Sequence, residues 1–386
     1  MFPTLASFLL PTWLAWSLLA FGFAACVSGI TLYAWRTAPS DEARLPRTLR
    51  MGVAGMIAVT IVFRLIFYLG AGTHAGSSTL HVLNYGLFIL GGVLLAQGLT
   101  VWFARREWSA AEEPRITHHA WELGLYNFVV GVLGAGLVYK IINWSTMAER
   151  PEQLANPTGG LVYYGAAFAG WATTYVYGRR TGLSFWRMGD LGFIGSLGQA
   201  VGRLGCYAVG CCFGRVVPAS FPWAVTFPPY TLQGTVRMPS PAYAAQSTDV
   251  RYVLESTGEV FSHAVPGAVR IADWISWHGQ ALPVHPSQLY EAAGQAALFV
   301  VMLIFRGWRR FEGQTFGAWL IGYAAVRGSV EFFRGDVERG TLHGLVGAIP
   351  LGAWYDFSTS QLISLVVAAL GLAVLTVRSR TAAKTA

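Results

Sequence analysis

The sequence predicts an all-helical polytopic membrane protein with about nine membrane-spanning helices. Hydrophobic residues make up 54% of the 386 residues and charged residues only 12%, whereas soluble domains carry about 25% charged residues. Glycine (45 residues) and tryptophan (15 residues) are abundant, as is typical of transmembrane helices and of their interfaces with water. These observations together indicate lipid, rather than water, as the solvent of most of the chain.

Long apolar segments recur along the chain. A helix needs about 20 mostly apolar residues to cross the hydrocarbon core of a bilayer. The sixth and eighth candidate segments are the least apolar, because each carries polar or charged residues near one end. The predicted spans are residues 9–34, 51–71, 83–103, 121–143, 159–178, 187–208, 286–306, 315–333 and 358–377.

Basic residues cluster in every second loop, which predicts the orientation of the chain. Loops rich in arginine and lysine stay in the cytoplasm. We therefore expect an outside N-terminus and a cytoplasmic C-terminus. The same loops account for the net charge of +8 without nucleic-acid binding, which would require a basic soluble domain. The arginines of these loops are Arg36, Arg44, Arg47, Arg50, Arg105, Arg106, Arg179, Arg180, Arg306, Arg309, Arg310, Arg378 and Arg380, and Lys384 joins the last group.

Residues 212–285 differ from the rest in composition. The segment is rich in proline, serine and threonine, and it contains alternating stretches at 222–227 and 250–255 that predict short strands. It connects the sixth and seventh spans on the outer side. We therefore expect a small extracytoplasmic α/β head.

Charged residues within spans predict functional sites, because each costs about 2.5–3.5 kcal/mol to insert at the centre of a helix. Three segments near the outer helix ends carry such residues: 202–215, 285–291 and 323–334. In the last of these, Arg327 and Glu331 are four residues apart on one helix face, so we expect them to pair.

Arginines at the outer leaflet favour an anionic phospholipid headgroup as ligand. The planar guanidinium group matches phosphate oxygens with two parallel hydrogen bonds. Arg203 and Arg327, with Glu331 between the charges, could form such a site. The alternative interpretation is a structural network that holds the helices together.

Several of these motifs, in this order, resemble the prolipoprotein diacylglyceryl transferase family. The resemblance runs from about residue 80 to residue 380, and it makes the first two spans an addition to a seven-helix core. It divides the chain into two additional helices (1–80), a first part of the core (81–211), the head (212–285), and a second part of the core with a cytoplasmic tail (286–386). The family landmarks are Gly134–Trp144, Gly202–Arg215, Trp223–Pro228, His285–Glu291, Arg327 with Glu331–Arg334, and Gln361–Ser364.

The resemblance implies a reaction in a bacterial inner membrane. The thiol of a lipobox cysteine, which follows the signal peptide of a prolipoprotein, attacks the glyceryl carbon of phosphatidylglycerol, and glycerol phosphate leaves. It implies catalytic roles for Arg203, Arg327 and Glu331, and no cofactor or metal. The implied partners are phosphatidylglycerol, the prolipoprotein and membrane lipids. Substrate-binding roles are implied for Tyr323, Arg334, His285, Gly214 and Tyr290.

Three positions depart from the family pattern. Tyr164 stands where the family typically has a histidine, Cys206 where it has an asparagine, and Cys211 where it has a glutamate. Tyrosine can donate a proton or a hydrogen bond, but with a pKa of about 10 it is a poor base at neutral pH. Tyr164 is therefore a catalytic candidate, and His285 is a substitute for the proton acceptor.

Cys206, Cys211 and Cys212 admit more than one interpretation. A disulfide is plausible on the oxidising side of a membrane. Packing of small side chains, a catalytic thiol and a metal site are the alternatives, although a metal would require further ligands. The same departures leave two other functions open for the chain: a phospholipid-dependent transferase with a different acceptor, and a non-catalytic lipid-binding protein.

Overall fold

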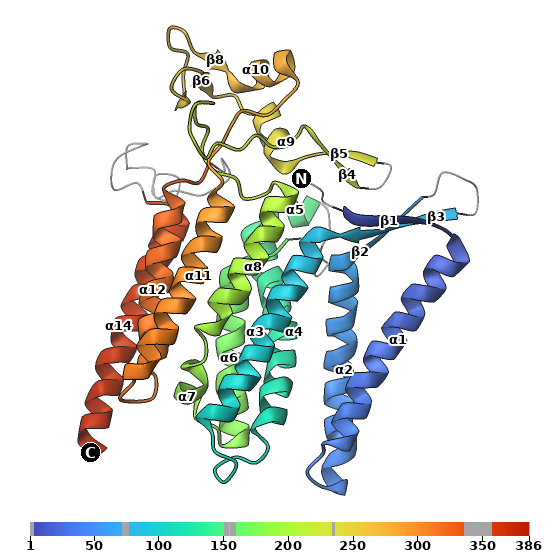
Figure 1. Cartoon of the computed structure of the whole chain (residues 1–386), viewed down its shortest axis with the longest axis vertical. Coiled ribbons are helices and arrows are strands. Elements are labelled where there is room, and N and C mark those ends of the chain that lie inside the picture. Colours follow the sequence, from blue (N-terminus) through green and yellow to red (C-terminus); the bar gives the residue numbers. More distant parts are fainter. Residues whose placement is uncertain are drawn as a thin grey trace. The chain divides into compact units, whose positions relative to one another are not determined.

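The structure is a computed structural model that describes residues 4–71, 77–149, 154, 160–233, 236–335 and 357–385. Helices dominate these residues, and they form two compact units (Figure 1). The first unit comprises Met1–Ser7, His81–Leu95 and Gly192–Ala386, and the second comprises Phe8–Leu80 and Ala96–Leu191. Helix α3 (Asn84–Glu107) begins in the first unit and ends in the second.

The second unit is built from long helices that pack in pairs. Helix α1 packs on α2, and α4 packs on α6. The bounds are α1 (Thr12–Arg36), α2 (Asp41–Ile66), α4 (Ile116–Ile142), α5 (Trp144–Glu149), α6 (Tyr163–Thr181) and α7 (Phe185–Gly189), and the strands near the N-terminus are β1 (Thr4–Pro11), β2 (Phe67–Ala71) and β3 (Ser77–Leu83).

The predicted span 51–71 is wrong at its end, because residues 67–71 form β2 rather than helix. Aromatic side chains at Phe67 and Tyr68 favour a strand, and Gly70 is a poor helix former. The hydrophobicity of this stretch predicted the membrane span but not where the helix stops.

A buried polar network lies inside the second unit. The Glu122 carboxylate in α4 is 8% exposed and accepts hydrogen bonds from the hydroxyls of Tyr126 (3.0 Å) and Tyr177 (3.2 Å). Arg47 of α2 lies 3.6 Å from the same carboxylate. The network therefore links α2, α4 and α6 inside an apolar unit, where an unpaired charge would be costly.

The first unit contains four long helices and the head. Helix α11 packs against α8 and α12, and α12 packs along α14. The end of α8, the start of α11, the end of α12 and the start of α14 all lie at the end of the unit that carries the head (Figure 1). The helices are α8 (Ile194–Val209), α11 (Ser287–Phe305), α12 (Gln314–Glu331) and α14 (Thr359–Thr385), and a 3-10 turn, η2 (Arg306–Trp308), follows α11.

The head has the predicted α/β composition. Strand β6 pairs with β7 and β8 in an antiparallel sheet, and β4 pairs with β5. Helix α9 lies between β5 and β6 in sequence, and α10 follows β8. The predicted strand at 250–255 is confirmed as β6. The predicted strand at 222–227 is wrong, because only Val225 forms a bridge, to Val284. The bounds are β4 (Tyr230–Gln233), β5 (Val236–Pro239), α9 (Pro241–Ser247), β6 (Tyr252–Leu254), β7 (Glu259–Phe261), β8 (Val269–Arg270) and α10 (Ile271–His278).

The head also has a small core of its own. Val253 of β6 packs with Ile271 and Ile275 of α10, and all three are almost fully buried. These residues give the insertion between α8 and α11 an apolar centre independent of the membrane helices.

Six helices among the described residues are long and apolar enough to cross a membrane. They cover Leu14–Arg36, Asp41–Phe63, Asn84–Glu107, Ile116–Ile142, Ser287–Trp308 and Thr359–Lys384. The other three predicted spans fall mainly on α6, α8 and α12, which are helical but shorter or more polar. The predicted span 187–208 is wrong at its start, because it begins in α7 and residues 190–193 between α7 and α8 form a turn. The polar residues of α8 and α12 include those that build the candidate site.

Glycine allows α12 and α14 to approach closely. A Cβ atom added at Gly371 would lie 2.6 Å from the carbonyl oxygen of Gly317, and one added at Gly317 would lie 2.9 Å from the carbonyl oxygen of Gly371. Small residues at helix contacts are a common means of association in membranes, because they bring the backbones together.

We expect Gly371→Ala to lower the unfolding temperature of the protein in detergent. The added methyl group meets backbone, which cannot rotate away, and overpacking of this kind costs about 1–3 kcal/mol. The matched control is Gly98→Ala in α3, where an added Cβ meets no atom within 4 Å. Equal unfolding temperatures for the two variants would contradict the close contact of α12 and α14.

Candidate functional site

The three charged motifs of the sequence meet at the head end of the first unit. The N–H of Gly214 donates to the carbonyl of His285 (2.9 Å), and the N–H of Arg215 donates to the carbonyl of Phe333 (2.9 Å). The N–H of His285 returns a hydrogen bond to the carbonyl of Arg215 (2.9 Å). The segment after α8, the segment before α11 and the end of α12 are thereby joined through their backbones.

Gly214 is required at this junction for space. A Cβ atom there would lie 2.5 Å from the His285 carbonyl oxygen and 2.6 Å from the Phe333 carbonyl oxygen. No side chain fits between backbones at that separation. The structure therefore gives Gly214 a positioning role, and its predicted contact with substrate stays a prediction.

Arg203 in α8 forms an ion pair with Glu291 in α11. One guanidinium nitrogen lies 2.8 Å from the carboxylate, whose side chain is fully buried, while the arginine side chain is 17% exposed. The amide of Gln199, one turn earlier in α8, donates to the same carboxylate oxygen at 3.1 Å. Opposite charge and a hydrogen bond lower the cost of burying both groups.

Helix α11 presents a polar face toward the interior of the unit. Gln288, Glu291 and Gln295 follow each other at helical spacing and are all fully buried. Gln288 donates to the carbonyl of Cys211 at 2.7 Å. The second carboxylate oxygen of Glu291 and both amide atoms of Gln295 have no hydrogen-bond partner among the described residues. This face can therefore accept a polar group.

Arg327 and Glu331 in α12 form the predicted pair, with 2.8 Å between nitrogen and oxygen. Arg327 also donates to the hydroxyl of Ser360, at the start of α14, at 2.9 Å. Both charged residues are buried. The ion pair thus lies inside the contact of α12 with α14.

The other two predicted site residues of this helix end are also buried. Arg334 donates to the carbonyl of Cys212 at 2.8 Å, which ties the end of α12 to the segment after α8. Tyr323, one turn before Arg327, lies within electrostatic range of Arg203. Tyr323 and Arg327 are four residues apart, so both lie on the same face of α12.

His285 lies in an aromatic cluster next to the Gly214 junction. Its ring contacts Phe221, Tyr290 and Phe333 edge-on, and its Nδ1 lies 3.2 Å from the Tyr290 hydroxyl. Burial, and then the positive charge of Arg215, lower the pKa of His285 below its ordinary value of 6.5. The imidazole is therefore neutral at pH 7 and able to accept a proton.

Tyr164 lies in α6 of the second unit, where its ring contacts Tyr163 edge-on. Its catalytic role stays a prediction. Cys206, Cys211 and Cys212 are free thiols in the first unit, and the disulfide remains an untested alternative. Cys206 is buried beside Arg203, with 4.0 Å between its sulfur and one guanidinium nitrogen.

Several residues that contribute to the site lie outside the set predicted from the sequence. Glu291 lies within the predicted motif 285–291 without a predicted role, although it is the direct partner of Arg203. Three further residues have no predicted role: Gln199, Gln295 and Ser360. The signal in the sequence that could have identified them is the helical spacing of polar residues within apolar segments, because such residues predict a helix face that points into the protein.

This arrangement can bind an anion at a membrane helix end. It supplies arginines of fixed position, with carboxylates that hold them in place and leave nitrogen donors for other acceptors. Polar groups of α11 can bind hydroxyls, and a neutral imidazole can take up a proton. Among the described residues, the one group that could hold a metal ion is formed by Cys206, Cys211 and Cys212.

Comparison with known proteins agrees with this picture. The family model of prolipoprotein diacylglyceryl transferase matches residues 73–377. The phosphatidylglycerol–prolipoprotein diacylglyceryl transferase of Clostridium tetani is 25% identical over 75% of this chain and 93% of its own length. Proteins of the same name from Citrobacter koseri (29% identity, 75% of this chain, 86% of theirs) and Erwinia tasmaniensis (31%, 69% and 81%) are also similar. The chain belongs to the prolipoprotein diacylglyceryl transferase family.

Proposed function

We propose that this protein transfers a diacylglyceryl group from phosphatidylglycerol to the lipobox cysteine of prolipoproteins. The observation that carries the proposal is the pair of arginines, Arg203 and Arg327, each held by a carboxylate at one end of the first unit. Both lie within the residues matched by the family model. Several relatives carry the name of this activity.

The proposed topology has nine membrane-spanning helices in a bacterial inner membrane. The six apolar helices are joined by α6, α8 and α12. The polar ends of α8 and α12 carry the residues of the site. The N-terminus and the head lie outside and the C-terminus lies in the cytoplasm, because the arginine-rich loops alternate with arginine-poor ones. The site then opens at the outer leaflet, where the signal peptide of a translocated prolipoprotein presents its cysteine.

In the proposed reaction, the cysteine sulfur forms a bond to the glyceryl carbon while the bond from that carbon to the phosphate oxygen breaks. Glycerol phosphate leaves with the electron pair of the broken bond. Charge grows on the phosphate oxygens as this happens, and Arg203 and Arg327 stabilise it through charge-assisted hydrogen bonds. Glu291 and Glu331 fix the two guanidinium groups before the substrate arrives.

The thiol proton also needs an acceptor. We infer that His285 takes it, since its lowered pKa keeps the imidazole neutral at pH 7 and it lies beside the Gly214 junction. Tyr164 is not the base in this proposal, because a phenol with a pKa of about 10 holds its proton at this pH.

We expect Arg203→Ala and Arg327→Ala each to lower transfer by at least about 100-fold, the usual effect of removing one electrostatic stabiliser of a developing charge. Arg203→Lys should also be defective, since an ammonium group cannot form the two parallel hydrogen bonds. The measurement is thioether formation on a lipobox peptide by the purified protein with phosphatidylglycerol vesicles, with insertion of each variant checked separately.

Arg270→Ala is the control, because Arg270 pairs with Asp273 at the exposed surface of the head, and it should behave as the unchanged protein. Wild-type activity of either site variant would show that the site is misplaced. Consumption of phosphatidylglycerol without a modified peptide would point to a different acceptor. Binding of the lipid without turnover would point to a non-catalytic protein.

A second prediction concerns pH. If His285 accepts the proton, kcat/KM falls as the pH falls through its pKa, which lies below 6.5 because burial and Arg215 disfavour the charged form. His285→Gln should remove this acid limb and lower the rate at pH 7, whereas Tyr164→Phe should keep the limb. An acid limb that persists in His285→Gln would assign the proton to another group.

A further inference from the structure

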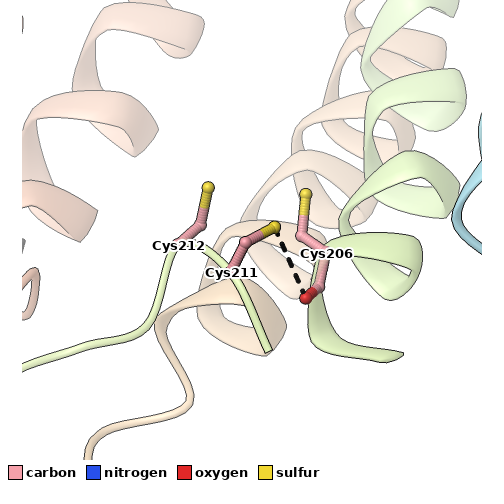
Figure 2. A group of neighbouring side chains, drawn as sticks. All are labelled: Cys206, Cys211 and Cys212. Atoms are coloured by element: carbon pink, nitrogen blue, oxygen red, sulfur yellow. Dashed lines mark hydrogen bonds between the residues drawn. The ribbon is translucent and has the colours of Figure 1, made fainter. Parts of the chain in front are cut away.

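The sulfur atoms of three cysteines lie together beside the proposed transfer site. The Sγ atoms of Cys206, Cys211 and Cys212 are all within 4.8 Å of one another. Figure 2 shows that Cys206 comes from the end of α8 and that the other two come from the segment after it, with Cys206 and Cys212 pointing the same way. Cys26, the fourth cysteine, lies in α1 of the second unit.

The turn that ends α8 brings these residues together. Gly210 adopts a left-handed conformation (φ 84°) and its N–H donates to the carbonyl of Cys206. The N–H of Cys211 donates to the same carbonyl at 3.2 Å, and the Cys211 thiol donates to it at 3.7 Å (Figure 2). Cys212 is the one described non-glycine residue with a positive φ, 58°. The chain thus doubles back at the cost of a strained residue.

The backbone of the trio is held by polar side chains from α11 and from the segment directly after α12. Ser287 donates to the carbonyl of Cys212 at 2.8 Å and Gln288 donates to the carbonyl of Cys211 at 2.7 Å, both from α11. Arg334 donates to the carbonyl of Cys212 at 2.8 Å. The backbone that carries Cys211 and Cys212 is therefore held in place by hydrogen bonds from neighbouring side chains, as the ligands of a metal site usually are.

Two arginines lie next to the trio. One guanidinium nitrogen of Arg203 lies 4.0 Å from the Cys206 sulfur, and one of Arg334 lies 2.8 Å from the carbonyl oxygen of Cys212. Cysteine binds metal ions in its thiolate form, and arginines beside the sulfurs help to offset the negative charge that three thiolates and one monovalent cation leave.

We propose that Cys206, Cys211 and Cys212 form a three-sulfur site for a soft monovalent metal cation of the Cu(I) class. Thiolates select soft cations. Three sulfurs around one ion at metal–sulfur distances of about 2.3 Å would be about 4 Å apart, which fits the separations in the structure. Among the described residues, no histidine, aspartate, glutamate or further cysteine joins the cluster, so the tetrahedral set of protein ligands that structural zinc requires is incomplete. Each thiol that binds releases its proton to solvent.

The test is titration of the full-length reduced protein with Cu(I) in detergent, without oxygen, against a chromophoric Cu(I) chelator. We expect one bound Cu(I) per chain, and X-ray absorption should give three sulfur neighbours at about 2.3 Å. We expect each of three single variants to weaken Cu(I) binding by at least about 10-fold: Cys206→Ser, Cys211→Ser and Cys212→Ser. Loss of a residue that only hydrogen-bonds to a metal ligand already weakens metal binding by about 10–100-fold.

Cys26→Ser is the matched control, and it should bind Cu(I) like the unchanged protein. Three outcomes would overturn the proposal. The first is Cu(I) binding no tighter than that of the triple serine variant, and the second is displacement of Cu(I) by Zn(II) at equal concentration. The third is a count of two rather than four free thiols when the protein is isolated under denaturing conditions with its thiols blocked, because that count would identify a disulfide. Because the measurement is metal binding, absence of Cu(I) binding would not contradict the proposed diacylglyceryl transfer. Loss of transfer in a variant would likewise not contradict the metal site.

Discussion

Burial of arginine among apolar helices is the constraint on which the first unit depends. An unpaired charge at this depth costs several kilocalories per mole, and each arginine has its own carboxylate: Glu291 for Arg203 and Glu331 for Arg327. One pair joins α8 to α11, and the other lies within α12, where Ser360 of α14 completes it. Polar residues in these segments are what make α8 and α12 less apolar than ordinary membrane spans, and the same residues form the proposed anion site.

Helix α11 has the central part in this arrangement. It contributes Glu291 to the ion pair and Gln288 to the turn after α8, and it begins directly beyond His285. Its buried polar face replaces the apolar face that a membrane helix normally turns toward its neighbours. Specific hydrogen bonds thus fix the register of α11 against α8, because a shift of one residue would leave a charged group without its partner.

Much of the fold could be predicted from the sequence, because hydrophobic length and alternate basic loops are strong signals of membrane helices. The Arg327–Glu331 pair was also predictable, since it is local to one helix. The Arg203–Glu291 pair was not, because its members are far apart in the chain and nothing local specifies which carboxylate an arginine meets. The end of the second span was wrong for a different reason: residues 67–71 are apolar enough to continue the span, but Phe67 and Tyr68 favour a strand and Gly70 is a poor helix former.

The same distinction applies to the cysteines. Their spacing in the sequence allowed a disulfide, simple packing or a ligand set, and the turn at Gly210 brings all three sulfurs to one place. A left-handed residue at Cys212 cannot be inferred from composition. Cys206 and Cys211, the two cysteines predicted to depart from the family pattern, therefore have their sulfurs close together in space.

The backbone junction at Gly214 also determines how this end of the unit can open. Its hydrogen bonds couple the end of α8, the start of α11 and the end of α12, so none of the three can fray without releasing the others. Amide protons of Gly214, Arg215 and His285 should exchange with solvent as one cooperative unit. Thermal opening of this junction would separate the residues of the proposed anion site and those of the cysteine trio in a single event. Gly214, the smallest residue of the region, therefore couples the two sites.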